Sequence, residues 1–580
     1  MLVEDGNFTE FQGHPRSDRP MTASGPRGSK YLRALRELLP QKSDYAAVRG
    51  SWRQDLLAGV TVGIVALPLA LAFGVSSGVG AAAGLVTAVI AGFVAAVFGG
   101  SHVQVSGPTG AMVVVLAPVV ADHGVGMVAI LCLLAGVLMI IIGASRLGRA
   151  VAYIPWPVVE GFTAGIGIII FLQQVPLAVS VEAEHGKNTV VTAFAALREA
   201  SWSQARGGLI VVVLVAIMMW LLPKLHRALP ASLLAIVAAT LVVKFTGLQN
   251  QVPVLGKLPE SLPTPQLPEF DPGAVPSLAS AIFAIAALAG IESLLSARVA
   301  SGLAGPTGQT TGPYNPDREL VGQGLASIAA GMFGGMPATG AIARTAVNVR
   351  SGARTRLAAI THALVLLTVV YLAAGLVGQV PLAALAGVLL VTAARMVSIP
   401  VAKRVLGSTR SDALAYVLTA VITVSFDLIV AIQIGIVAAA LLTLRKFARL
   451  GSVRRELIDG PVVQGDERIV IFRLDGLMFF GAADRILHEL TDVDDVSVVI
   501  LRLSQLRYLD ATGAQALVEV IRELEQRGIS VLVKGIRREH LTLARRVGVI
   551  EELRHENHLF EFLPDAVAHA RSHVARTSSP

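Results

Sequence analysis

The chain has 580 residues, of which 54% are hydrophobic and 15% charged, and its mean hydropathy is +0.67. Soluble domains carry about 25% charged residues, so this composition excludes a soluble globular protein. The net charge of +8 does not indicate nucleic-acid binding, because the basic residues lie scattered between hydrophobic segments. We find no zinc-ligand spacing, and the single cysteine, Cys132, excludes an internal disulfide bond and favours a small buried apolar role.

Residues 1–50 combine Gly, Pro, Ser and charged residues and lack the apolar core of a signal peptide. We expect a largely disordered cytoplasmic tail, in which residues 31–39 have the pattern of a short basic helix at the lipid headgroups. Residues 51–447 contain apolar runs such as 130–144 and 357–377, which approach or reach the ~20 residues that cross a bilayer. The sequence therefore predicts a transmembrane domain over residues 51–447.

About fourteen crossing or half-crossing segments fit between Leu56 and Leu444. Lys and Arg are enriched in cytoplasmic loops, and with fourteen segments the basic loops all fall on one side. Both termini are then cytoplasmic, in a protein of the cell membrane. The polar middle of residues 175–206, which this topology places outside, has room for an amphipathic helix but not easily for a further span.

An internal repeat divides these segments. Three pairs of similar stretches occur in the same order at near-constant offsets of 224 to 235: residues 67–78 with 291–302, 98–100 with 333–335, and 109–111 with 339–341. A repeat of about seven segments is odd-numbered, so the second copy must be inverted relative to the first. We predict a polytopic α-helical membrane protein built as a 7+7 inverted repeat.

The repeated Thr-Gly-Ala elements predict the binding site. Each follows a stretch of poor helix formers and begins a short apolar helix, so the N-termini of two half-helices meet near the midplane. Free backbone amides and the positive ends of the helix dipoles bind an anion there. The alternative is a pair of helix-packing motifs. The candidate substrate-binding residues of these elements are Thr109, Gly110, Ala111, Thr339, Gly340 and Ala341.

Two charged residues lie within apolar segments. A carboxylate at the bilayer centre costs about 2.5–3.5 kcal/mol, so Glu292 is a functional candidate. It either binds Na⁺ with Thr339 and with Ser296, one turn away on the same helix face, or carries a proton; the structural alternative is pairing with Arg344 or a backbone end. Arg344 either adds a positive charge beside the anion or extends to the cytoplasmic interface.

Residues 448–580 are rich in charge and predict a separate cytoplasmic α/β domain. We expect strands at 469–473, 496–503 and 530–533 and helices at 511–526 and 537–546. Asp510 and Thr512 fall at the N-terminus of the first helix. They serve either as helix caps or as a phosphorylation or partner site.

These residues resemble SulP anion transporters, the family of bacterial sulfate permeases and cyanobacterial bicarbonate transporters. The resemblance covers about residues 55–570 and is most specific in residues 103–111, 318–324 and 337–345. The tail is similar to the STAS domain that ends these proteins. The resemblance implies a core and a gate domain, a homodimer, and an anion between the third and tenth segments.

Further residue roles follow from this resemblance alone. It implies that Ala338 belongs to the substrate site, that Phe73 forms an apolar wall there, and that Thr512 matches a phosphorylatable position of related bacterial regulators. Sodium-dependent bicarbonate transporters carry an Asp on the eighth segment and a Thr four residues later, where this chain has Glu292 and Ser296. Both pairs offer oxygen ligands, so Na⁺ and H⁺ both stay open as coupling ions.

We therefore expect a secondary transporter of a small inorganic anion, first sulfate or bicarbonate, by Na⁺ or H⁺ symport or by anion exchange. Dicarboxylate or chloride transport is an alternative within the family. A nucleobase permease shares the architecture but places carboxylates on both the eighth and tenth segments, whereas the tenth here carries Arg344. A membrane-anchored signalling protein needs far fewer segments. We expect no enzymatic activity and no cofactor beyond Na⁺, and a cytoplasmic partner of the tail is an open alternative.

Overall fold

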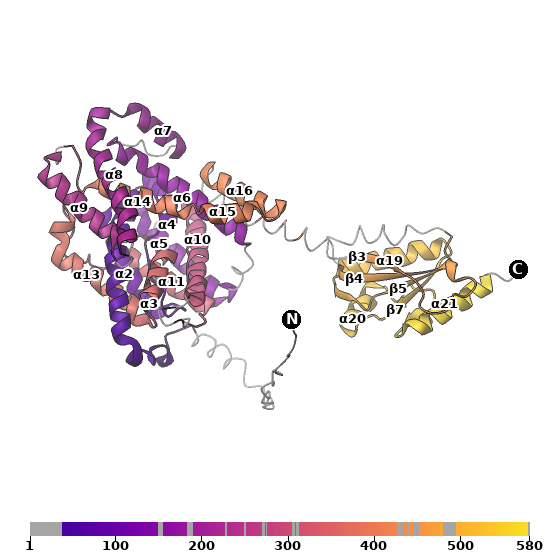
Figure 1. Ribbon diagram of the computed structural model, residues 1–580. Coiled ribbons are helices and arrows are strands. Elements are labelled where there is room, and N and C mark those ends of the chain that lie inside the picture. Colours follow the sequence, from indigo (N-terminus) through magenta and orange to yellow (C-terminus); the bar gives the residue numbers. More distant parts are fainter. Residues whose placement is uncertain are drawn as a thin grey trace, which may run out of the picture. The chain divides into compact units, whose positions relative to one another are not determined.

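The computed structural model forms two compact units (Figure 1). One comprises Met1–Tyr153, Thr163–Ile399 and Ala420–Ile429, and the other Ile154–Phe162, Pro400–Thr419 and Val430–Pro580. The structure describes residues 38–577 with gaps at 149–154, 182–188, 227–228, 249–250, 269–272, 274, 304, 306–307, 309–311, 426–451 except 434, 437, 441 and 444, and 479–494. The predicted helix at residues 31–39 lies almost entirely outside these residues.

Long apolar helices make up the membrane part. The spans of sufficient length are α2 (Val48–Ser76), α3 (Ala81–Phe98), α5 (Met127–Ala144), α6 (Trp156–Ala178), α8 (Trp202–Leu225), α10 (Val275–Gly302), α13 (Arg356–Val377), and α14 (Leu382–Met396) with α15 (Ile399–Leu406). Shorter helices are α4 (Gly110–His123), α9 (Ala231–Phe245), α11 (Pro316–Met332), α12 (Ile342–Arg350) and α16 (Arg410–Ser425). This set fits the predicted fourteen or so segments.

The polar region between α6 and α8 contains one further described helix, α7 (Thr189–Glu199). Its small residues Ala193 and Ala196 are buried, while Val191, Phe194 and Leu197 are exposed. These exposed residues repeat every three positions and therefore share one helix face. The described helix has 11 residues, too few to cross a bilayer, as the sequence leads us to expect for this region.

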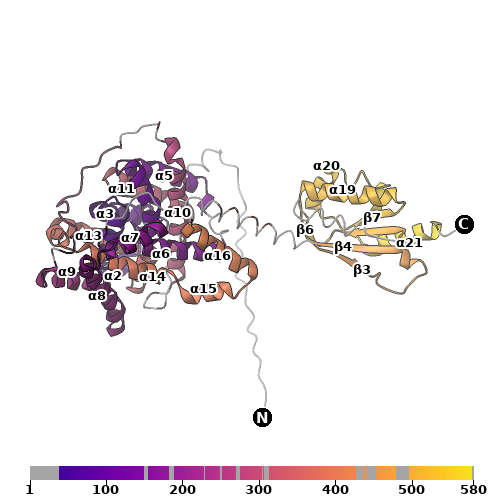
Figure 2. The ribbon, with the colours of Figure 1, turned by 90° about the horizontal axis from the view of Figure 1, so that it is seen from above.

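The two halves of the membrane part interlock. When α2 to α5 are matched with α10 to α13, each contact between the halves has a counterpart: α2–α13 with α10–α5, α3–α13 with α11–α5, and α2–α12 with α10–α4. Figures 1 and 2 show α3, α5, α10 and α11 beside one another. This exchange of partners is the pattern of an inverted repeat, so the predicted 7+7 architecture is confirmed.

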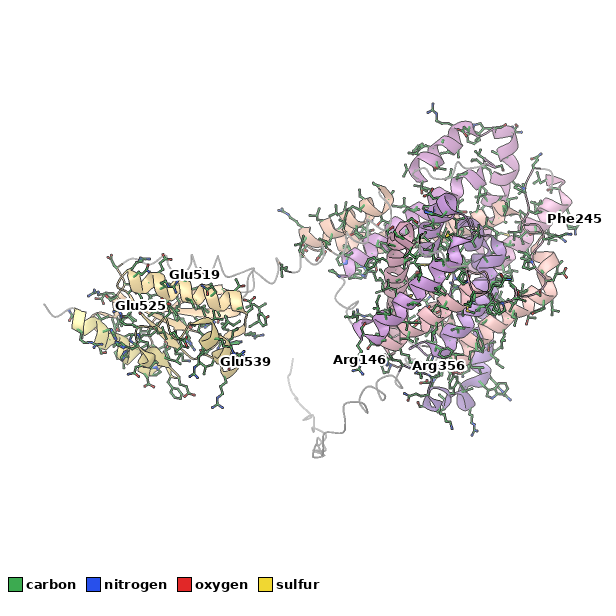
Figure 3. The ribbon with its side chains drawn as sticks, turned by 180° about the vertical axis from the view of Figure 1, so that it is seen from behind. Arg146, Phe245, Arg356, Glu519, Glu525 and Glu539 are labelled. Carbon is green, nitrogen blue, oxygen red and sulfur yellow. The ribbon has the colours of Figure 1, made fainter. Side chains whose placement is uncertain are left out.

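Outward faces of these helices are apolar. Phe245 at the end of α9 is 80% exposed, as is Leu372 on α13, and Figure 3 shows Phe245 at the periphery of the helices. Exposed apolar surface on this scale is unstable in water and fits contact with lipid.

Arg356 lies in the first turn of α13, where it is 1% exposed and donates from Nη1 to Ala96 O at 2.9 Å (Figure 3).

A buried carboxylate fastens the beginning of α13 to α2. Asp55 is fully buried, and its Oδ1 accepts hydrogen bonds from the backbone N–H groups of Arg354 (2.7 Å) and Thr355 (3.0 Å). Its Oδ2 accepts from the hydroxyls of Ser51 and Thr355, each at 2.7 Å. All four donors share one acceptor group, so its removal leaves two buried N–H groups unsatisfied.

We predict that Asp55→Ala lowers the free energy of unfolding by about 3 kcal/mol, because buried donors lose a charged acceptor. Asp55→Asn should cost less, since its Oδ1 still accepts from both backbone groups. Thermal unfolding of the purified protein in detergent measures both variants. Equal melting temperatures for Asp55→Ala and the unchanged protein would contradict this role.

The other unit contains a sheet in the order β3-β4-β5-β7-β8, with β6 paired to β4 beside it. Strand β3 is antiparallel to β4, and the other neighbours are parallel. The strands are β3 (Ser452–Glu456), β4 (Ile469–Met478), β5 (Val498–Arg502), β6 (Leu506–Leu509), β7 (Ser530–Lys534) and β8 (Leu559–Phe560). This is the α/β tail that the sequence predicts.

Helices cover both faces of this sheet. The helices are α19 (Ala511–Gln526), α20 (Arg538–Val547) and α21 (Leu563–Thr577). Along β4, Val470 and Phe472 pack against α19, whereas Ile469 and Ile471 pack against α21, as the two-residue period of a strand requires. The three predicted strands and two predicted helices are present; β3, β6, β8 and α21 are additional.

Candidate functional site

The two repeated elements meet as a two-stranded antiparallel sheet. Strand β1 (Ser106–Gly107) pairs with β2 (Thr339–Gly340), with Ser106 opposite Gly340 and Gly107 opposite Thr339. Helix α4 begins three residues after the end of β1, and α12 begins two residues after the end of β2. The N-termini of both helices therefore lie at this junction, where their first backbone N–H groups have no intrahelical acceptor.

Both threonines share a carboxylate oxygen from α10. Thr109 Oγ1 donates to Glu292 Oε2 at 2.9 Å, Thr339 Oγ1 donates to the same oxygen at 2.8 Å, and the two hydroxyl oxygens lie 3.3 Å apart. Thr109 is 4% exposed and Thr339 is fully buried. The structure thus joins three predicted site residues, from α10 and both repeats, in one cluster.

Ser296 lies elsewhere. Its hydroxyl donates to Thr345 Oγ1 at 3.1 Å, and Thr345 Oγ1 also accepts from Val105 N–H at 3.0 Å. Ser293, also on α10, accepts a hydrogen bond at its Oγ from Gly340 N–H at 3.0 Å. The structure therefore does not direct Ser296 toward Glu292. Its part in a Na⁺ site stays a prediction.

Arg344 is buried beside β1. It lies in the first turn of α12, is 2% exposed, and donates from Nη2 to Pro108 O. It interacts electrostatically with Glu292, and its Nη1 has no hydrogen-bond partner among the described residues. Extension to the interface is therefore wrong for Arg344. The expectation that α12 is apolar is also wrong, because Thr345 and Asn348 are further buried polar residues on it.

Gln104 is a polar residue at the junction that the sequence did not single out. Its side chain is 5% exposed, and neither Nε2 nor Oε1 has a hydrogen-bond partner among the described residues. It lies against β2, because a Cβ atom at Gly340 would be only 1.5 Å from its Nε2. An unpaired buried amide costs free energy, which fits a group that binds a ligand. Its position within residues 103–111, which resemble the family, was the available signal.

Apolar groups close over the beginning of α4. A Cβ atom at Gly110 would overlap Ile170 Cδ1 and lie 3.4 Å from Phe73 Cε1, so a larger residue there would require the Ile170 side chain to shift. The structure thus places Phe73 next to Gly110, where the predicted apolar wall requires it. The remaining predicted substrate-binding residues are also buried, namely Ala111, Ala338 and Ala341.

Helix α11 supports the approach to β1. Glu319 Oε2 accepts from the backbone N–H groups of Gly100 (2.7 Å) and Ser101 (2.9 Å). Gln323 Nε2 donates to Glu319 Oε1 at 2.9 Å and to Ser106 Oγ at 2.6 Å. These bonds give a physical reason for the similarity at residues 318–324: the motif positions β1 without touching the threonines.

In the α/β tail, Asp510 caps α19 by accepting from Gly513 N–H at 2.7 Å. The capping alternative is therefore present in the structure. Thr512 is exposed in the first turn of α19 and is accessible to a modifying enzyme. Its regulatory role stays a prediction.

Thr345 provides the sharpest structural test of the junction. We predict that Thr345→Val lowers the free energy of unfolding by about 1–3 kcal/mol, because the isosteric side chain leaves the buried Val105 N–H without its acceptor. Thr345→Ser keeps the hydroxyl and should stay near the unchanged protein. Melting temperatures of the two purified variants measure the difference, and equal destabilisation by both would refute the hydrogen bond.

The interlocked repeats, the helix N-termini at β1 and β2, and the α/β tail define a polytopic membrane protein of the inverted-repeat transporter class. Residues 52–419 match the Sulfate permease family, and residues 460–566 match the STAS domain. The first match covers more than half of the chain. The protein belongs to the Sulfate permease family and carries a C-terminal STAS domain.

Curated relatives extend this result. The chain is 31% identical over 522 residues to the "Putative sulfate transporter YvdB" of Bacillus subtilis, covering 88% of this chain and 96% of the relative. It is 31% identical over 525 residues to the "Bicarbonate transporter BicA" of Picosynechococcus sp., covering 85% and 92%.

Two solved structures are similar to this one. The transmembrane domain of a cyanobacterium bicarbonate transporter BicA is 33% identical, with a TM-score of 0.60 over 67% of this chain and 97% of that one. The structure of SLC26A9 is 16% identical, with a TM-score of 0.79 over 97% of this chain and 99% of that one. The second likeness shows the fold alone.

Proposed function

We propose that this protein is a secondary active transporter of a small inorganic anion, with sulfate or bicarbonate as the substrate. The observation that carries the proposal is the junction of β1 and β2, where Thr109 and Thr339 share Glu292 at the N-termini of opposed helices. Family membership supports it, since the relatives named above are described as sulfate or bicarbonate transporters.

The anion is held by hydrogen-bond donors at two helix N-termini and on two buried side chains. The first backbone N–H groups of α4 and α12 lack intrahelical acceptors, and each helix dipole places partial positive charge there. Arg344 Nη1 and the amide of Gln104, which have no hydrogen-bond partner within the part of the chain that the structure describes, are further buried donors near the junction. Phe73 and Ile170 exclude water beside Gly110, which strengthens these electrostatic contacts.

Glu292 couples a cation to the anion. While its carboxylate is ionised, it takes the hydroxyl hydrogens of both Thr109 and Thr339, and its negative charge repels an anion at the junction. A proton or Na⁺ on Glu292 removes that charge and releases the hydroxyls to donate to the anion. Occupancy by the cation thus favours anion binding, which is the thermodynamic requirement for symport.

Several features of the whole protein belong to this proposal. We infer a cell-membrane location with both termini in the cytoplasm, a homodimer, and a transport domain over residues 51–447 followed by the STAS domain over residues 448–580. Thr512 and the cap residue Asp510 mark the face on which a cytoplasmic partner or kinase acts.

Dicarboxylate and chloride are alternative substrates. A nucleobase permease is disfavoured because α12 carries Arg344 and no acidic residue.

Transport by purified protein in liposomes tests the proposal. Uptake of radiolabelled sulfate, bicarbonate and dicarboxylate is measured with Na⁺ and pH gradients imposed separately, and chloride flux is measured in parallel. The proposal expects uptake of sulfate or bicarbonate that one cation gradient or an opposing anion gradient accelerates. Failure of every anion to move under every gradient would overturn it.

We predict that Thr109→Val and Thr339→Val each reduce the apparent affinity for the anion by about tenfold or more, the equivalent of one lost hydrogen bond. The matched variants Thr109→Ser and Thr339→Ser keep the hydroxyl and should retain most of the affinity. The measurement is the concentration dependence of uptake. Equal uptake by the Val and Ser variants would remove the hydroxyls from the site.

Glu292→Gln should separate transport from its cation dependence. The neutral amide cannot take up a proton and offers no charge to Na⁺, so we expect uptake to become nearly independent of the cation gradient that drives the unchanged protein. Glu260→Gln, in an exposed loop, is the control and should keep that dependence. Unchanged Na⁺ and pH dependence in Glu292→Gln would show that another residue couples the cation.

A further inference from the structure

Four histidines gather beside strand β8 of the STAS domain. His555 and His558 precede β8, and His569 and His573 lie one turn apart on α21, so the latter two share a helix face. The ring centroid of His558 lies 5.6 Å from that of His555, 5.5 Å from that of His569 and 5.4 Å from that of His573. The sequence contains the spacing H-x2-H followed by H-x3-H, so the prediction that no zinc-ligand spacing occurs is wrong.

The ring nitrogens are spaced for a metal ion. One nitrogen each from His558, His569 and His573 lies within 4.8 Å of the other two. The Nε2 atoms of His569 and His573 are 3.2 Å apart. Ligand nitrogens at about 2.0–2.1 Å from a tetrahedral metal ion are separated by about 3.3 Å, so the helical pair already has the required distance.

His558 is prepared as a ligand by its surroundings. Its side chain is 1% exposed, it is hydrogen-bonded to the backbone of Val531 on β7, and its Nδ1 has no partner among the described residues. A backbone hydrogen bond on one ring nitrogen is the arrangement that orients a metal-ligating histidine.

We propose that His558, His569 and His573 form a binding site for a divalent transition-metal ion of the zinc class. Imidazole nitrogens suit Zn²⁺ and its neighbours rather than Mg²⁺ or Ca²⁺, which prefer oxygen ligands. The fourth coordination position is filled by His555 or by water. The bound ion joins α21 to the strand edge at β8, at a site separate from the anion-binding residues.

Metal content of the full-length protein tests this site. The protein is purified without a polyhistidine tag, treated with a chelator, incubated with ZnCl₂ and dialysed, and zinc is then counted by mass spectrometry. We expect about one Zn²⁺ per chain, and at least a tenfold loss of bound zinc in the variant His569→Ala/His573→Ala, which keeps only one of the three ligands. The control His540→Gln alters a buried histidine of the same domain outside the cluster and should keep the ion.

A second measurement distinguishes the loss of metal ligands from misfolding of the double variant. Co²⁺ replaces Zn²⁺ in the unchanged protein and in His573→Gln, and the visible absorption of tetrahedral Co²⁺ reports the coordination. We expect this absorption in the unchanged protein and its loss in His573→Gln, while both proteins keep the same melting temperature without metal. Absence of bound zinc in the unchanged protein, or equal zinc in the double variant, would overturn the proposal.

Discussion

The site depends on one carboxylate oxygen that two threonine hydroxyls share. Glu292 belongs to α10, Thr109 precedes α4 and Thr339 belongs to β2, so this interaction joins the inverted repeats at their meeting point. It is stable only because β1 and β2 pair and bring two helix N-termini together. The charge of Glu292 therefore sets the affinity of the junction for an anion, and a cation bound to Glu292 raises that affinity.

Other buried polar groups hold this junction in place. Glu319 and Gln323 fix the chain that leads into β1, and Thr345 fixes Val105 from the second repeat. Asp55 performs a similar task at the beginning of α13. Glu319, Thr345 and Asp55 each accept hydrogen bonds from backbone N–H groups outside regular helices and sheets, as irregular backbone at membrane depth requires.

Much of the junction of β1 and β2 could be predicted from the sequence, because the repeated elements follow residues that interrupt a helix. The Thr-Gly-Ala elements located both helix N-termini, and the isolated charge of Glu292 marked the third member. Sequence could not show that Ser296 bonds Thr345 instead of facing Glu292, since both arrangements fit the same helical spacing. Gln104 was missed because a lone amide carries no pattern, whereas the histidine spacing is present in the sequence and was overlooked.

A double-mutant cycle on anion affinity tests the central claim, that Thr109 and Thr339 act as one site through Glu292. Apparent affinities for whichever anion the protein transports are measured by uptake for Thr109→Val, Thr339→Val and the double variant. The shared acceptor predicts that the double variant loses clearly less than the sum of the two single losses in free energy. Simple addition of the two losses would contradict the claim and assign the threonines to independent positions.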